Sequence, residues 1–204
     1  MRVLGVDPGL GRCGWAVLER RGGRVLPAGY GTIHTDGDQV APRLATLAAG
    51  LRQVLADHRP QALAIERLFF NANVRTAMTV GQASGVVLLL AAEHGLEVSA
   101  YTPPQVKQAV TGSGSAPKEQ VGYMVKALLG LAAVPTPADT ADALAVALCH
   151  LNHTGLAAAG PRAGPRADKG GSIGAASAAD WLARAAPTSP GLAKGAGVPK
   201  GVRG

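Results

Sequence analysis

The sequence predicts an α/β domain built on a mixed five-stranded sheet, and three observations support this. Three apolar runs near the N-terminus are separated by turn residues, two further apolar runs follow, and segments of helical periodicity lie between and after them. A three-stranded meander followed by alternating helices and strands predicts a mixed sheet that carries helices on both faces.

The turn signals set the bounds of each element. Residues 2–6 and 13–19 form a predicted hairpin around the turn PGLGR, and Pro27 with two glycines indicates that the third strand, 25–33, is an irregular edge strand. Apolar residues then recur at helical spacing from Leu44 to Leu55, with the helix ending near His58. The remaining elements are expected in this order: a strand at 62–65, a helix at 74–93, a strand at 96–101 and helices at 118–129 and 138–151.

Composition divides the chain of 204 residues into two parts. Residues 1–154 form the predicted domain, whereas 155–204 hold 7 basic and 2 acidic side chains, and 30 of those 50 positions are Gly, Ala or Pro. So little large apolar surface predicts a flexible basic tail, in which only the stretch 175–186 around Trp181 has helical character. The net charge of +7 favours polyanionic partners such as nucleic acid.

The same composition bears on location. Cys13 and Cys149 are the only cysteines, which fits a reducing cytoplasm better than a disulfide-built secreted domain. The N-terminus lacks the long apolar core of a signal peptide, and the longest apolar run, 86–92, is far shorter than a membrane span. We therefore expect a cytoplasmic protein with no membrane partner.

Four acidic residues are candidates for a metal site. Asp7 and Glu66 each follow a predicted strand, and Asp139 and Asp142 begin the last helix three residues apart, on one helical face. Clustered carboxylates repel one another unless a cation neutralises them, and hard oxygen ligands of this kind suit Mg²⁺ or Mn²⁺. Two such ions support phosphodiester hydrolysis, so the pattern predicts a nuclease.

Each acid also has a purely structural interpretation. Asp7 precedes Pro-Gly, a common turn sequence, and Glu66 could merely solvate a strand end. Asp139 fits a capping box in which Thr136 is the N-cap and Pro137 the first helical residue. Asp142 lies beyond the first turn, where capping does not explain it.

Several motifs together resemble the RuvC family of Holliday junction resolvases. They are GVDPGLGRCGWAV, AIERLFFN, PPQVKQAVTGSGSAPKEQV and ADTADALAVALCH, which span residues 1 to about 153 in the family's order. The resemblance implies a ribonuclease H-like fold, a homodimer, and paired symmetric nicks across a four-way DNA junction. It also implies two Mg²⁺ ions per site, with Mn²⁺ able to substitute, and a branch-migration helicase complex as partner.

The resemblance also assigns roles to individual residues. The family's four acids fall on Asp7, Glu66, Asp139 and Asp142, although some members have histidine at the position of Asp139. The predicted DNA-binding residues are Phe69, Arg75, Lys107 and Lys118, with Arg67 as a further candidate. An aromatic residue near the metals can stack on a base, and lysines near phosphates add affinity without reading sequence.

A C2 dimer suits a junction with two equivalent strands. The helix over residues 78–92 is the predicted interface: Gly81, Ser84 and Gly85 would permit close approach, and Val87, Leu88 and Leu90 would supply apolar contact. Ordinary core packing of this helix is the alternative.

Other functions remain open on the sequence. The segment DPGLGRCGWA also resembles the phosphate-binding turn of an actin-like ATPase or sugar kinase, of which this core would be half. A non-catalytic junction-binding protein is a second alternative. Cys149, His150 and His153 could be zinc ligands, but their close spacing gives poor tetrahedral geometry.

Overall fold

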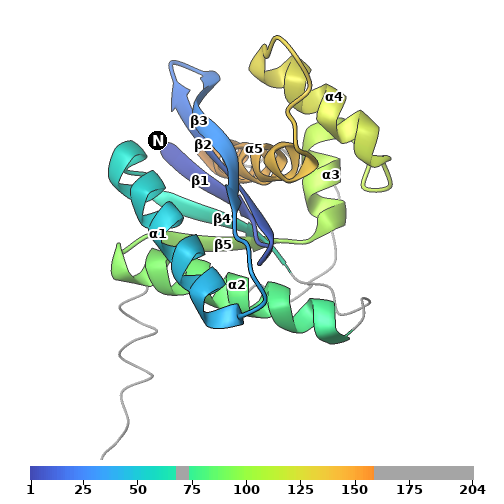
Figure 1. Cartoon of the computed structure of the whole chain (residues 1–204). Coiled ribbons are helices and arrows are strands. Elements are labelled where there is room, and N and C mark those ends of the chain that lie inside the picture. The colour runs from blue at the N-terminus through green and yellow to red at the C-terminus, as the bar shows by residue number, and fades with distance from the viewer. Residues whose placement is uncertain (68–73, 159–204) are drawn as a thin grey trace, which may run out of the picture.

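The protein is described by a computed structural model that covers the main chain of residues 1–67 and 74–158 and the side chains of residues 1–67 and 76–154 (Figure 1). Five strands form one sheet in the order β3-β2-β1-β4-β5. The strands are β1 (Arg2–Asp7), β2 (Arg12–Arg21), β3 (Arg24–His34), β4 (Ala62–Glu66) and β5 (Glu97–Tyr101). The first three strands pair antiparallel and β1, β4 and β5 run parallel, which confirms the predicted mixed sheet.

The edge strand β3 is irregular, as predicted. Its pairing with β2 shifts between Val17 and Leu18, which lie opposite Gly29 and Pro27. One residue of β3 is therefore extra at this point, which is the signature of a β-bulge. Pro27 lacks an amide hydrogen and is tolerated because β3 is the last strand of the sheet.

Two helices cover one face of the sheet, α1 (Val40–His58) and α2 (Val74–Glu93) (Figure 1). Leu47 and Leu51 of α1 and Val87 and Leu90 of α2 are buried against it. The strand residues on this face belong to one set of alternate positions: Leu4, Val6, Cys13, Val17, Leu63 and Ile65. The alternation of β1, β2 and β4 thus sends their large apolar residues towards α1 and α2.

Three helices cover the opposite face, α3 (Pro103–Thr111), α4 (Lys118–Leu129) and α5 (Ala138–Ala158) (Figure 1). The strands present small residues to α5. A Cβ at Gly5 would lie 2.8 Å from the Cβ of Ala147, and one at Gly14 would lie 2.5 Å from the carbonyl carbon of Asp139. Both distances are far inside van der Waals contact, so glycine at these positions allows α5 to lie directly on β1 and β2.

Helix α3 was not among the predicted elements. It has nine residues, and Pro103 and Pro104 open it. Its start is nevertheless marked by a capping box, because the Thr102 hydroxyl accepts from the Gln105 amide and the Gln105 side chain accepts from the Thr102 amide. The pattern Thr-Pro-x-Gln is the sequence signal that would have identified the helix.

The start of α5 corrects a second prediction. The helix begins at Ala138, and the carbonyl of Pro137 accepts the Thr140 amide at 3.0 Å. Pro137, rather than Thr136, therefore precedes the helix, and the expected capping box between Thr136 and Asp139 does not form. The helix runs on to Ala158, past the expected end at residue 151, and residues 159–204, including the stretch 175–186, lie outside the described part of the chain.

Within the described residues, one helical window, Thr76–Glu93 in α2, is long and apolar enough to cross a membrane by length and hydropathy alone. Ala83, Val87, Leu90 and Ala91 of this window are buried in the core beneath the sheet. A core helix of a globular protein satisfies the same two criteria.

Candidate active site

Strand alternation places Asp7 and Glu66 on the face of the sheet that carries α5. Val6 of β1 lies beside Ile65 of β4 in the parallel register, so Asp7 and Glu66 are the next residues of neighbouring strands. Val6 and Ile65 point towards α1 and α2, which turns the residue after each towards α5. Both carboxylates thus leave the carboxyl end of a strand in the same direction.

Helix α5 brings the other two acids to the same place. Asp139 lies in its first turn, directly over Gly14 of β2, and Asp142 follows one turn later. Between them, the buried hydroxyl of Thr140 lies 2.9 Å from the hydroxyl of Thr32 in β3. The start of the helix is therefore fixed to the sheet by both packing and a hydrogen bond.

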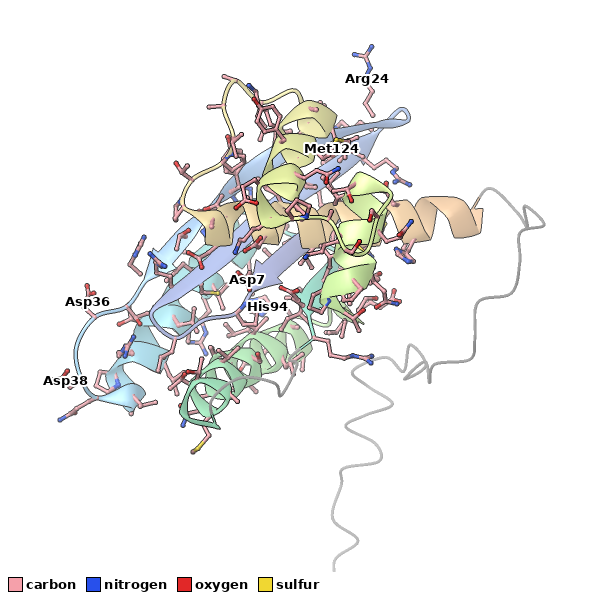
Figure 2. The ribbon with its side chains drawn as sticks, turned by 90° about the vertical axis from the view of Figure 1, so that its right-hand side faces the viewer. Asp7, Arg24, Asp36, Asp38, His94 and Met124 are labelled. Carbon is pink, nitrogen blue, oxygen red and sulfur yellow. The ribbon has the colours of Figure 1, made fainter. Side chains whose placement is uncertain are left out.

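Asp7 lies close enough to the other three acids for their charges to raise its pKa. The pKa of Asp7 is raised from 3.8 to about 7, most of all by burial and then by the charges of Asp142, Glu66 and Asp139, in that order. Burial also raises the pKa of Glu66, with the Asp142 charge as the second cause. The structure therefore brings the other three predicted acids into the neighbourhood of Asp7, which is labelled in Figure 2.

Two lysines form one wall of the site. The Lys118 ammonium lies 2.6 Å from Asp142 Oδ2, and this contact raises the pKa of Lys118. Lys107 of α3 acts with Lys118 to oppose the rise in the pKa of Glu66. A pocket of about 180 Å³ lies between these side chains, and it is lined by Glu66, Pro103, Val106, Lys107, Lys118, Val121, Asp142 and Ala145.

Arg12 forms the opposite wall. Its Nε lies 3.2 Å from Asp139 Oδ2, yet that oxygen is buried and no described group donates a hydrogen bond to it. The sequence pattern does not single out Arg12, because its position beside Asp139 depends on the packing of α5 over Gly14. Its place at the far end of the turn that follows Asp7 is the only signal that could have suggested it.

The donor set fits a hard divalent cation. All four groups are carboxylates, and Asp139 Oδ2 is a buried acceptor that lacks a hydrogen-bond donor among the described residues. No group of three or more described His, Cys, Asp or Glu side chains is already arranged around a common metal position. The outer acids turn instead towards cations of the protein, Asp142 towards Lys118 and Asp139 towards Arg12.

The other predicted DNA-binding residues have different outcomes. Lys107 and Lys118 both line the pocket beside the acids. Phe69 lies outside the described residues, and Arg75 lies in α2 with a side chain that is not described. Arg67 is exposed just after β4, and its amide donates to the Tyr101 carbonyl at 2.6 Å.

The predicted interface helix is partly corrected. Val87 and Leu90 are buried in the core against the sheet and are not available to a partner. Met78, Leu88 and Leu89 are exposed, at 61%, 44% and 56%. The apolar surface that α2 offers to solvent is therefore carried by these three residues, of which only Leu88 was predicted.

The Cys149, His150 and His153 group engages in other contacts. His150 Nδ1 lies 2.9 Å from the Tyr101 hydroxyl, and His153 Nδ1 lies 2.8 Å from the Cys149 carbonyl. Burial lowers the pKa of His150 and raises that of Cys149 to about 12. His150 thus connects α5 to Tyr101 of β5, and the Cys149 thiol donates to the Gln105 carbonyl of α3 at 3.7 Å.

The strand order, with an antiparallel meander beside parallel strands, is that of the ribonuclease H-like class of nucleases. A solved structure of T. thermophilus RuvC in complex with Holliday junction substrate matches with a TM-score of 0.73 at 38% identity, covering 77% of this chain and 96% of that one. The yeast mitochondrial Holliday junction resolvase matches with a TM-score of 0.54 at 14% identity, and that likeness concerns the fold alone.

Sequence comparison gives the family directly. The family model for the crossover junction endodeoxyribonuclease RuvC matches residues 3–150. The RuvC of Moorella thermoacetica is 52% identical over 151 residues, covering 74% of this chain and 90% of that protein, and the RuvC of Frankia alni is 55% identical over 153 residues, covering 74% and 78%. The chain belongs to the RuvC family of crossover junction endodeoxyribonucleases. This membership favours the nuclease over the actin-like ATPase.

Proposed function

We propose that this chain resolves four-way DNA junctions by paired symmetric nicks, using two Mg²⁺ ions per site to hydrolyse phosphodiester bonds. The observation that carries the proposal is the convergence of four carboxylates from β1, β4 and α5 on one edge of the sheet, where burial and the charges of the other three acids raise the pKa of Asp7 to about 7. Family membership indicates which substrate these acids act on.

Asp7, Glu66, Asp139 and Asp142 are the residues that would hold the metal. Such ions, when bound, supply an activated water and stabilise the leaving oxygen of an in-line displacement. Carboxylate oxygens favour Mg²⁺ or Mn²⁺ over zinc. Burial and the negative charge of neighbouring carboxylates both raise the pKa of Asp7 and Glu66, and a cation is favoured here because it stabilises their ionised forms.

The basic residues of the site would hold the DNA. Lys107 and Lys118 lie beside Glu66 and Asp142, so a phosphate brought to these acids meets two positive charges on the α3 and α4 side. Such contacts position the strand without reading its sequence. We extend the same role to Arg75 as a further basic candidate, and we assign base stacking to Phe69, which lies in the motif AIERLFFN that resembles the family.

A homodimer would place two such sites on one junction. We propose that the exposed apolar face of α2, Met78, Leu88 and Leu89, contributes to the dimer interface. A cytoplasmic location, which the cysteine content favours, and a branch-migration helicase partner, which the family resemblance implies, complete the proposal. The domain would end near residue 154, with 155–204 as a basic tail.

The experiment compares cleavage of a synthetic four-way junction with cleavage of a linear duplex of the same sequence. We expect Mg²⁺-dependent nicks at symmetric positions on two opposing strands of the junction, and no nicks in the duplex. Binding without cleavage in Mg²⁺ or Mn²⁺ would identify a non-catalytic junction-binding protein. Nucleotide hydrolysis without DNA would instead favour the ATPase.

A matched pair of variants tests the acids. Asp7→Asn is expected to abolish nicking, because a metal ligand is lost. The variant should still bind the junction, because a repulsive charge near phosphate is removed. Asp36→Asn makes the same chemical change on the exposed connection between β3 and α1, away from Asp7 (Figure 2), and is expected to nick normally. Normal nicking by Asp7→Asn would show that Asp7 is not a metal ligand.

A further inference from the structure

Arg12 begins β2 at the far end of the turn that follows Asp7. Its side chain is 60% exposed, and its Nε lies 3.2 Å from Asp139 Oδ2 without a hydrogen bond to that oxygen. An ion pair this exposed contributes little to stability. The guanidinium can therefore exchange Asp139 for another anion at small cost in free energy.

The main chain that carries Arg12 is held firmly. The Thr35 amide donates to the Gly11 carbonyl at 3.1 Å, and the Thr35 hydroxyl donates to the Leu10 carbonyl. Arg43 Nε donates to the same hydroxyl at 3.2 Å, and Thr35 is buried. The turn between β1 and β2 is thus fixed to the connection between β3 and α1, so the exposed guanidinium of Arg12 extends from a fixed backbone.

The two acids of α5 face different cations. Asp142 lies against Lys118 of α4, on the side of the 180 Å³ pocket, whereas Asp139 lies against Arg12 of β2. Positive charge therefore flanks the carboxylates on two sides, from Arg12 of β2 on one side of β1 and from Lys118, which lines the pocket with Glu66 of β4, on the other. A strand of DNA that crosses the acids would pass between these two walls.

The other arginines of the three antiparallel strands either bind other groups of the protein or lie far from the acids. Arg2 and Arg21 pair with Glu19, and Arg20 donates to the Leu151 carbonyl. Arg24 lies in the β2–β3 hairpin, far from Asp7 (Figure 2). Arg12 is accordingly the arginine of β1–β3 that the structure places against the acids.

We propose that Arg12 binds a phosphate of the DNA strand on the wall opposite Lys107 and Lys118. This inference rests on the proposed function, since it takes the acidic cluster as the place where DNA is cut. A guanidinium presents two parallel N–H groups to a phosphate, a geometry that suits it better than the contact with Asp139, which is not a hydrogen bond. Asp139 holds the guanidinium near the site until the phosphate replaces it.

The test measures equilibrium binding to a four-way junction in Ca²⁺ over a series of salt concentrations, so that no cleavage is needed. Arg12→Gln is expected to bind roughly tenfold more weakly, as for loss of a charge-assisted hydrogen bond, and to lower the slope of log K against log salt by about 1. Arg24→Gln loses the same charge elsewhere and is expected to keep the wild-type slope. Arg12→Lys should keep the slope but recover only part of the affinity, because it lacks the planar fork.

A wild-type slope for Arg12→Gln would overturn the proposal, and so would an equal loss for Arg24→Gln, which would show a general charge effect. If Arg12→Gln lost only thermal stability, Arg12 would be a structural partner of Asp139 and the proposal would be wrong. Failure of the proposed function shows differently, as absence of junction nicking by the wild type in Mg²⁺. The binding comparison among the three variants does not depend on that result.

Discussion

Asp7→Asn should stabilise the protein while abolishing its activity. In the folded chain the pKa of Asp7 is raised from 3.8 to about 7. At about 1.4 kcal/mol for each tenfold change in acidity, ionising Asp7 in the folded state costs about 4 kcal/mol more than in the unfolded chain. Asparagine has nearly the same shape and no charge, so the variant avoids this loss.

The pH window follows from the direction of the shift. Between pH 4 and pH 7 the folded chain keeps on Asp7 a proton that the unfolded chain has released, so stability falls as pH rises through this window. Above about pH 7 both states are ionised and the loss is complete. The variant should therefore match the wild type near pH 4 and exceed it by up to about 4 kcal/mol near pH 8, or on the order of 10 °C in Tm.

The assay is urea unfolding of both proteins across this pH range in EDTA, followed by the same series in Mg²⁺. Metal binding to the folded wild type should raise its free energy of unfolding. The difference in stability between Asp7→Asn and the wild type should then be smaller, because the cation offsets the repulsion that asparagine removes. Asp36→Asn, on an exposed loop, controls for the loss of one charge. A variant no more stable than wild type at pH 8 in EDTA would refute the reasoning, and an equal gain at pH 4 would show that charge is not its cause.

Three further predictions concern the wall, the packing and the dimer. Lys118→Met should lower the rate of single-turnover junction cleavage at least tenfold with little effect on Tm, because it removes a positive charge beside the acids. An unchanged cleavage rate would show that Lys118 does not act in the site. Gly14→Ala should destabilise the chain by about 1 to 3 kcal/mol in urea unfolding, because its Cβ would overlap Asp139, and wild-type stability would contradict that packing. Leu89→Glu should convert a dimer to a monomer in analytical ultracentrifugation while Leu26→Glu, also exposed, does not; a dimer in both would place the interface elsewhere.

The positions of most elements could be predicted because each has a local signal. The strands β1 to β5 stand between turn residues, and α4 begins and ends where its periodicity does. The convergence of Asp7 and Glu66 could also be predicted, since strand ends on neighbouring parallel strands meet at one edge. What remained open was how the helices are oriented about their own axes.

Helix α2 shows why that orientation was not predictable. Its residues 86–92 are apolar without interruption, so periodicity does not separate a core face from an exposed face. The packing decides: Val87 and Leu90 point to the sheet, and Leu88 and Leu89 point to solvent. An interface inferred from composition alone therefore mixed residues of the two faces.

The partnership of Arg12 and Asp139 has a related cause. Residues 12 and 139 come together only because α5 lies in contact with β2 over Gly14, and that closeness depends on a missing side chain rather than on any polar signal. The same contact sets the place of Asp139 and Asp142 relative to Asp7 and buries Ala143 and Leu144 in the core. The apolar packing of α5 thus supplies the free energy that holds four repelling acids together. For this reason the protein should become more stable when a neutral residue replaces Asp7, although it then loses its activity.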